Sequence, residues 1–212
     1  MERSSGTIRK DIPLSQSDQV SNGQRRLRAD ARRNAEALLD AAKTVFASSG
    51  VDAPAKQIAD AAGVGVGTLY RHFPRRSDLV VAVFQREVDA CADAAATLAA
   101  EYPPGAALEK WLYRLTEFVA TKRGLAAALY SGDPAFDDLP AQFMARFGPA
   151  LENLLRAAAA SGEIQTAIGT NELIYAVAKL CHPLGEESAD QSQRMVTILI
   201  NGLRFEAPGS SG

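Results

Sequence analysis

Apolar residues recur every three or four positions along most of this chain, which is the spacing that one face of an α-helix produces. The first such series consists of Ala35, Leu38, Leu39, Ala42, Val45 and Phe46. Gly50 follows it and can take the left-handed conformation that often ends a helix. A short helix is expected next, over residues 54–62, with Pro54 at its first position. With abundant alanine and few β-branched runs, this pattern predicts an all-α fold.

Longer helices are predicted in the rest of the chain. Ser77 and Asp78 are expected to cap a helix that runs to about Ala100, where Pro103 and Pro104 end it. The next amphipathic face consists of Leu108, Trp111, Leu112, Leu115, Phe118 and Val119. Further helices are expected over residues 125–130, 139–160, 171–181 and 189–205, which brings the total to about nine.

The chain divides into four segments. Residues 1–24 are polar with no sustained apolar period, so we expect a flexible arm, and residues 208–212 form a short tail. Residues 25–76 and 77–207 are expected to form two helical domains. No apolar stretch reaches the roughly 20 residues of a membrane span, and the polar N-terminus lacks a secretory signal, so we expect a cytoplasmic protein without a membrane partner.

Composition is that of an ordinary globular protein, but charge is unevenly distributed. Of 212 residues, 47% are hydrophobic and 23% are charged, and the formal net charge is −2. Residues 1–80 carry +4 and residues 81–212 carry −6. A basic front on an acidic body suits a nucleic-acid binder with a second function, although many unrelated proteins show a difference of this size. Cys91 and Cys181 are too few for a disulfide framework, so both are expected to be reduced.

Residues 55–73, AKQIADAAGVGVGTLYRHF, fit a helix-turn-helix. This motif needs a small residue where two short helices cross and a residue that tolerates positive φ in the turn, and Ala59 and Gly63 meet those needs. The expected inward-facing residues are Ile58, Ala62, Val64 and Leu69. The second helix, over residues 66–72, then turns these residues toward the DNA major groove: Val66, Gly67, Thr68, Tyr70 and Arg71. An ordinary helical hairpin also has such small residues, but the hydroxyl and cationic groups on the outward face favour contact with DNA phosphates.

From about Arg28 to Val83 the chain resembles the tetracycline-repressor (TetR) family of bacterial transcription regulators. The residues that carry the resemblance are Phe46, Gly50, Ile58, Ala59, Ala62, Gly63, Val64, Gly67, Thr68, Leu69, Tyr70, His72, Phe73 and residues 76–79. The resemblance implies an all-helical homodimer, in which a three-helix DNA-binding domain joins a larger ligand-binding and dimerising domain through the long fourth helix. We therefore expect a ligand-released repressor of a palindromic operator, with recognition helices roughly 34–36 Å apart.

The family pattern also implies which residues contact double-stranded DNA. Carried over to this sequence, it makes Thr68, Tyr70 and His72 contacts, chiefly to phosphates, and it puts Arg76 at the position of a phosphate-binding lysine. Lys56 occupies a position that can reach a base or a phosphate. The predicted DNA-binding set is Lys56, Val66, Gly67, Thr68, Tyr70, Arg71, His72 and Arg76.

Departures from the family pattern and open alternatives affect this interface. Gly65 replaces a frequent polar capping residue, and Val66 offers only apolar contact to a thymine methyl. Readout is therefore expected to depend also on Lys56, Arg71, Tyr70 and DNA shape. His72 fits phosphate contact and satisfaction of a backbone group equally well. One further series fits either a solvated helix start or an arm that contacts DNA electrostatically, and we favour the arm. It consists of Arg25, Arg26, Arg28, Arg32 and Arg33.

The acidic part of the chain offers candidates for an effector pocket. They are Trp111, Tyr113, Phe118, Tyr130, Phe136, Phe143, Met144, Phe147 and Tyr175. Aromatic residues at helical spacing more often form core, and the period of Trp111 and Phe118 favours that interpretation, whereas Phe143 and Phe147 share a face that can line a cavity. Few charged residues fall on these faces, so an apolar or aromatic small-molecule effector is favoured over a charged one.

The last two expected helices are strongly apolar for terminal elements. In the family such a pair forms a four-helix dimer interface with its mate, which assigns to that interface Leu173, Val177, Leu180, Met195, Ile198, Leu199 and Leu203. Packing within the chain is the alternative. The two interpretations are compatible, because each helix has apolar residues on more than one face.

An enzyme and a helical protein-binding adaptor are the rival classes of function. An enzyme has little support, because no metal-ligand cluster, nucleophile motif or phosphate-binding loop is present. Cys181 and His182 are neighbours in sequence, which does not place a thiolate against its base. An adaptor explains the helices but not the polar outward face of residues 66–72. We therefore expect no catalytic residues, no metal and no cofactor.

Overall fold

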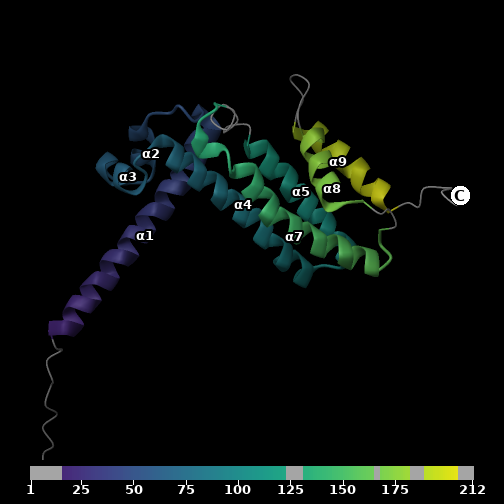
Figure 1. Ribbon diagram of the computed structural model, residues 1–212, viewed down its shortest axis with the longest axis horizontal. Helices are drawn as coiled ribbons and strands as arrows, with labels where there is room; N and C mark the ends of the chain where they lie inside the picture. Colours follow the sequence, from purple (N-terminus) through teal and green to yellow (C-terminus); the bar gives the residue numbers. More distant parts are fainter. Residues whose placement is uncertain (1–15, 123–130, 165–167, 182–188, 205–212) are drawn as a thin grey trace, which may run out of the picture.

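The protein is helical throughout the residues that the structure describes, which confirms the expected all-α class (Figure 1). The computed structural model describes residues 16–122, 131–164, 168–181 and 189–204. Those ranges hold eight α-helices and one 3-10 helix: α1 Gln16–Ser49, α2 Ala55–Ala61, α3 Val66–His72, α4 Arg76–Glu101, α5 Pro104–Lys122, η2 Pro134–Phe136, α7 Leu139–Ala160, α8 Thr170–Leu180 and α9 Ala189–Leu203. The helix expected over residues 125–130 lies outside the described residues.

The second half of α1 packs with α2 and α3 into a three-helix unit. Leu38 and Phe46 of α1, Ile58 of α2 and Leu69 of α3 are all buried in one hydrophobic core. The first half of α1 extends away from the rest of the molecule as a straight rod (Figure 1). The 34 residues of α1 span about 51 Å, so the half that projects accounts for about 25 Å of the molecular outline.

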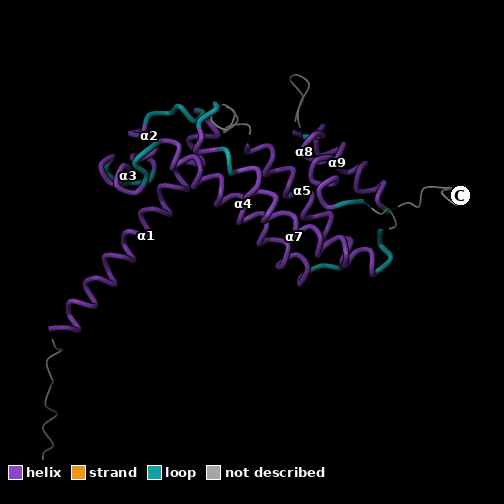
Figure 2. The backbone as a smooth tube through the Cα atoms, in the orientation of Figure 1, coloured by secondary structure: helices purple, strands orange, loops and turns teal. Residues whose placement is uncertain are grey.

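Helices α4, α5 and α7 lie side by side and form the centre of the larger body, with α8 and α9 packed against α5 (Figure 2). Trp111 of α5 is fully buried at this centre. Its indole N–H donates to the carbonyl oxygen of Cys91 on α4 over 2.9 Å, and its ring meets Phe147 of α7 edge to face at 5.5 Å. These contacts tie the three helices together and satisfy the polar atom that burial of a tryptophan brings with it.

Helix boundaries differ from the sequence expectations at three places. Helix α1 begins at Gln16, so residues 16–24 are helical where a flexible arm was expected. Pro54 is the residue before α2 rather than its first residue. Helix α4 begins at Arg76, and Asp78 caps it from inside the first turn, where its carboxylate accepts the backbone N–H of Arg75 at 2.9 Å. Ser77 is therefore part of the helix and not its cap.

Other boundaries agree with the expectations closely. Helix α7 covers residues 139–160 as predicted, and α8 and α9 begin or end within two residues of their predicted limits wherever those limits are described. Gly50 and Gly63 have φ of 76° and 68°, which confirms the expected left-handed positions after α1 and α2. None of the described helices combines the length and hydropathy needed to cross a bilayer.

Candidate nucleic-acid interface and effector cleft

The short helix α3 is fixed to the core on one side and open to solvent on the other. Leu69 is 3% exposed and holds the helix against α1 and α2. On the opposite side, Tyr70 is 52% exposed, and Gly67 and Arg71 are also exposed. A rigid helix that displays a phenol, a guanidinium and an open glycine offers hydrogen-bond donors in a shape that fits a DNA groove.

The turn before α3 has the geometry expected of a helix-turn-helix. Ala59 is fully buried at the crossing of α2 and α3, and its carbonyl accepts the N–H of Val64 at 3.0 Å. Gly63 supplies the positive φ between them. Gly65 precedes α3 in an extended conformation and provides no side-chain cap. The angle at which α3 leaves the core is therefore set by buried contacts and by backbone hydrogen bonds.

Four of the predicted DNA-contacting residues stand at the edges of this surface. Lys56 is exposed on α2, where its Nζ lies 2.6 Å from Oδ2 of Asp60. Thr68 and His72 are half-buried, and the His72 ring lies 6.3 Å from that of Phe73. Val66 is half-buried as well and packs against the hydrophobic core, so less of it faces outward than its predicted role requires.

Arg76 differs from its predicted role. Its guanidinium donates hydrogen bonds to the backbone carbonyls of Val51 and Ala53, in the loop between α1 and α2. The side chain therefore joins the first turn of α4 to the helix-turn-helix instead of standing free for a phosphate. Sequence reasoning missed this role, because the partners are carbonyl groups more than 20 residues away.

A neighbouring arginine caps α4 and was not among the predicted residues. Arg75 is exposed, and its Nη2 lies 2.7 Å from Oδ1 of Asp78. The hydrogen bonds from Arg75 hold the pKa of the Asp78 carboxyl below its usual value, and the same contacts raise the pKa of Arg75. The pair closes the first turn of α4, a few residues after the end of α3.

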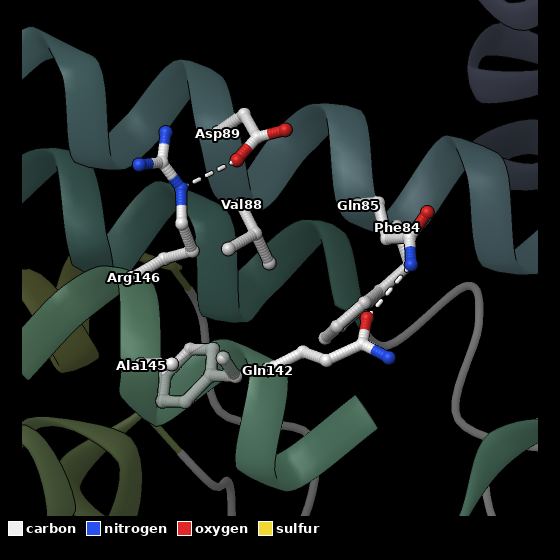
Figure 3. Close-up of a pocket in the computed structure, with 8 residues that line it drawn as sticks. Phe84, Gln85, Val88, Asp89, Gln142, Ala145 and Arg146 are labelled. Atoms are coloured by element: carbon white, nitrogen blue, oxygen red, sulfur yellow. Dashed lines mark hydrogen bonds and ion pairs between the residues drawn. The ribbon is translucent and has the colours of Figure 1, made fainter. Parts of the chain in front are cut away.

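A cleft of about 320 Å³ opens between α4 and α7 (Figure 3). It is lined by Phe84, Gln85, Val88, Asp89, Gln142, Phe143, Ala145 and Arg146. Two polar contacts cross it. The side-chain amide of Gln85 donates to Gln142 over 2.7 Å, and Nε of Arg146 donates to Asp89 over 2.6 Å, as the dashed lines in Figure 3 show. The cleft thus has an apolar wall of Phe84, Val88 and Phe143 beneath a polar rim.

Two carboxylates of α4 surround Arg146 on the rim of this cleft and leave the rim with a net negative charge. Nη2 of Arg146 also donates to Oδ1 of Asp93 at 2.8 Å, so one guanidinium meets two carboxylates of α4. Hydrogen bonds from the arginine to Asp89 and Asp93 raise the pKa of Arg146. None of the rim residues was predicted. The signal in the sequence is a shared spacing: Gln85 and Asp89 are four residues apart on α4, and their partners Gln142 and Arg146 are four residues apart on α7.

Among the predicted pocket residues, Phe143 alone lines the cleft. Its ring stacks on Phe118 at 5.8 Å and lies 4.4 Å from that of Phe147. Trp111 and Phe118 are buried in the core, as their period indicated, so neither lines a pocket. Phe147 is fully buried as well, which corrects its placement on a face that lines a cavity. The remaining candidates lie elsewhere. Met144 is half-buried, and the hydroxyl of Tyr113 forms a hydrogen bond with that of Thr197 on α9 at 2.9 Å. Tyr175 is 60% exposed on α8, Phe136 is in η2, and Tyr130 is outside the described residues.

Both parts of the chain match known family models. Residues 38–83 match a family model described as bacterial regulatory proteins of the tetR family, and residues 103–205 match one described as transcriptional regulator SbtR-like, C-terminal domain. A TetR transcriptional regulator from Streptomyces coelicolor is 36% identical with a TM-score of 0.68, and the alignment covers 82% of this chain and 99% of that chain. The chain belongs to the TetR family.

Further relatives agree with this membership. A TetR transcription regulatory protein from Mycobacterium vanbaalenii is 35% identical with a TM-score of 0.66, and the match covers 84% of this chain and 99% of that chain. An HTH-type transcriptional regulator from Staphylococcus aureus (strain USA300) is 41% identical over 64 residues, which is 30% of this chain and 35% of that protein. The match therefore spans about a third of this curated relative. The families matched are those of transcriptional regulators and not of enzymes.

The two C-terminal helices of this TetR-family protein carry an exposed apolar face. Tyr175 of α8 is 60% exposed, and Met195 and Ile198 of α9 are 39% and 63% exposed. Leu180 and Leu199 are half-buried beside them. Leu173, Val177 and Leu203 are buried within the chain, which corrects their assignment to a dimer interface. Tyr175, previously considered for the pocket, belongs instead to this exposed face.

Proposed function

We propose that this TetR-family protein is a ligand-released repressor that binds a palindromic operator as a homodimer. The observation that carries the proposal is the outward face of α3. Tyr70 and Arg71 stand in solvent, and a buried Leu69 holds them on a rigid element. An α-helix of this width fits the major groove, and a preorganised surface loses little side-chain entropy when it binds.

Charge around α3 supports contact with phosphates. Lys56 on α2 and Arg71 on α3 are exposed. The ion pair between Lys56 and Asp60 is on the surface, where such pairs are worth about 0.2–1 kcal/mol, so a phosphate can replace the carboxylate at little cost. Phosphate contacts position the protein, and Tyr70 and Arg71 are then in place to meet base edges.

The exposed apolar face of α8 and α9 supports a symmetric dimer. Tyr175, Met195 and Ile198 are large apolar side chains that a monomer leaves in water. A two-fold axis through this face pairs each helix with its copy, so the same residues are covered on both subunits. A palindromic operator then follows from symmetry, with half-sites about 34–36 Å apart.

The cleft between α4 and α7 is the proposed effector site, and a neutral aromatic molecule is the proposed class of effector. Phe84 and Phe143 offer ring faces, and the Gln85 and Gln142 amides can donate and accept hydrogen bonds. Arg146 is already neutralised by two carboxylates, which disfavours an anionic ligand. A molecule that binds the cleft in the form with low DNA affinity shifts the population away from the operator.

Replacement of Tyr70 tests the DNA-binding part of the proposal. Selection of bound genomic fragments identifies an operator, and fluorescence anisotropy then measures its affinity for the wild type and for Tyr70→Ala. We expect a loss of about 1–3 kcal/mol, or roughly 5- to 150-fold, because a groove contact disappears. Tyr102→Ala is the matched control, since Tyr102 is a 39% exposed tyrosine at the far end of α4.

Two outcomes of this experiment contradict the proposal. Unchanged operator affinity in Tyr70→Ala shows that α3 does not lie in the groove as described. Absence of any salt-dependent DNA binding by the wild type favours the adaptor or enzyme alternatives, because several phosphate contacts require log affinity to fall by about 0.9 per contact for each unit of log salt.

A further inference from the structure

The N-terminal half of α1 carries a concentrated positive charge that the helix-turn-helix does not use. Five arginines fall within nine positions, which we call the arginine ridge: Arg25, Arg26, Arg28, Arg32 and Arg33. From Arg25 onward, Leu38 is the first residue of α1 that is buried, so none of the five is held in the core. This part of α1 leaves the molecule at the end that holds α2 and α3 (Figure 1).

The helical conformation places all five arginines on one side of α1. At 100° per residue, Arg25, Arg28 and Arg32 share an arc of about 60°, and the whole ridge spans about 160° of the circumference. Asp30 and Leu27 lie outside that arc. Residues 25 to 33 extend over about 12 Å of the helix axis. A loose arm has no fixed arrangement of charges, so the helix turns a basic composition into an ordered cationic surface.

Most of the charge on the ridge is available to a partner. Arg32 is paired with Glu36 at 3.5 Å, and Arg33 is paired with Asp30. Both pairs are exposed and therefore weak. The other three arginines of the ridge make no ion pair among the described residues, and their side chains are exposed.

We propose that the arginine ridge binds the phosphate backbone of duplex DNA that flanks the site read by α3. This inference rests on the proposed DNA-binding function and adds a second contact surface to it. Duplex DNA presents one negative charge per roughly 1.7 Å of axis when both strands are counted, so a length of about 12 Å of duplex carries about seven phosphates, of which the ridge faces those on one side. The ridge and α3 project from the same end of the molecule, whereas residues 81–212 carry a charge of −6 and are repelled by DNA.

An anionic membrane is a less suitable partner for this surface. A helix that lies on a bilayer needs a broad apolar face opposite its cationic face. Leu27 is the one large apolar residue from position 25 to position 37, and it is 70% exposed on the side opposite the ridge. Asp30 shares that side. The rod therefore lacks the apolar area that insertion among lipids requires.

The salt dependence of DNA binding tests the arginine ridge. The full-length protein and a variant with Arg25→Gln, Arg26→Gln and Arg28→Gln are titrated onto a random-sequence 30-base-pair duplex between 50 and 200 mM KCl. Loss of three phosphate contacts per subunit lowers the slope of log affinity against log salt by about 2.7 for each ridge that lies on the duplex. Over this fourfold change in salt, the wild-type affinity is expected to fall about 40-fold more than that of the variant when one ridge is bound, and further when both subunits contribute.

Two matched variants separate ridge contacts from general charge effects. Lys110→Gln, Arg114→Gln and Arg156→Gln remove three exposed positive charges from α5 and α7, and this variant should keep the wild-type slope. Arg25→Lys, Arg26→Lys and Arg28→Lys preserve the charge and should also keep it. Circular dichroism checks that helix content is unchanged in each variant.

Different failures have different meanings in this design. If the ridge variant keeps the wild-type slope, or if the control loses as much slope as the ridge variant, the ridge does not bind DNA and the inference is wrong, while the function of α3 stands. If the wild type shows no salt-dependent binding, the proposed DNA-binding function itself fails. The same proteins are also titrated onto phosphatidylserine vesicles. If the ridge variant loses affinity for the vesicles and not for the duplex, the partner is a membrane and the inference is overturned.

Discussion

Gly67 and Gly63 allow the stability and the DNA affinity of the helix-turn-helix to be separated. A Cβ atom built on either glycine meets nothing within 4 Å, so an added methyl group causes no clash in the folded protein. The two positions differ in backbone conformation. Gly63 has φ of 68°, whereas Gly67 is in the first turn of α3 with ordinary helical geometry. Replacement by alanine therefore has opposite expected effects on folding.

The expected magnitudes follow from these conformations. Gly63→Ala forces a Cβ into the left-handed region and should lower the free energy of unfolding by about 1–2 kcal/mol. Gly67→Ala reduces the freedom of the unfolded chain and should raise the free energy of unfolding by about 0.5 kcal/mol, the lower part of the usual range, because the first turn of a helix tolerates glycine well. The two variants should thus differ by about 2 kcal/mol in urea denaturation at one fixed protein concentration.

DNA binding should change in the other direction at Gly67. The fold gives no reason for a glycine there, since alanine fits and favours the helix. Close approach of the α3 backbone to DNA would explain the glycine at position 67, because the first turn of α3 is exposed beside Tyr70. We expect Gly67→Ala to weaken operator binding by at least about 1 kcal/mol, or roughly fivefold, in the same anisotropy assay. A stabilised variant with unchanged affinity would refute the placement of this turn against DNA.

Three further predictions concern the rest of the molecule. Ile198→Glu should convert the dimer into a folded monomer in sedimentation equilibrium, because a charge would be buried at the two-fold axis, and an unchanged dimer mass contradicts the assigned face. Asp78 has a pKa below its ordinary 3.8, so its contribution to stability is present above pH 4 and lost as the pH falls through the folded pKa; urea unfolding of Asp78→Asn should show a weaker acid dependence than wild type. Burial raises the pKa of Cys91 to about 12, so iodoacetamide at pH 8 should alkylate it only after unfolding, and rapid labelling of the native protein would contradict its burial.

Helices with an apolar period in the sequence were predicted well, whereas the polar first half of α1 was not. Helix α7 has an apolar period along its whole length, and its two ends were predicted correctly. The first half of α1 has no such period, so composition favoured an arm. Helix formation propagates easily from a nucleated segment, and the buried second half of α1 supplies that nucleus. Residues with good helix propensity, such as the arginines of the ridge, then extend it.

Contacts between distant segments account for most of the differences at the candidate sites. Arg76 binds carbonyl groups whose positions depend on the loop conformation, which no local pattern encodes. The C-terminal helices have apolar residues on several faces, and the sequence does not show which face packs within the chain and which is left for a second subunit. Leu173 is covered internally and Ile198 is not, and only the packing of α8 and α9 on α5 decides between them.

Helix α4 connects the proposed effector site to the proposed DNA-binding surface. Its 26 residues span about 39 Å. At one end Arg76 holds the loop before α2, and further along Asp89 and Asp93 hold Arg146 of α7. The ion pairs to Arg146 are exposed and therefore worth little, so a ligand that enters the cleft can break them at low cost. The partly buried bonds from Arg76 do not compete with such a ligand, so we expect them to carry a displacement of α4 to the helix-turn-helix.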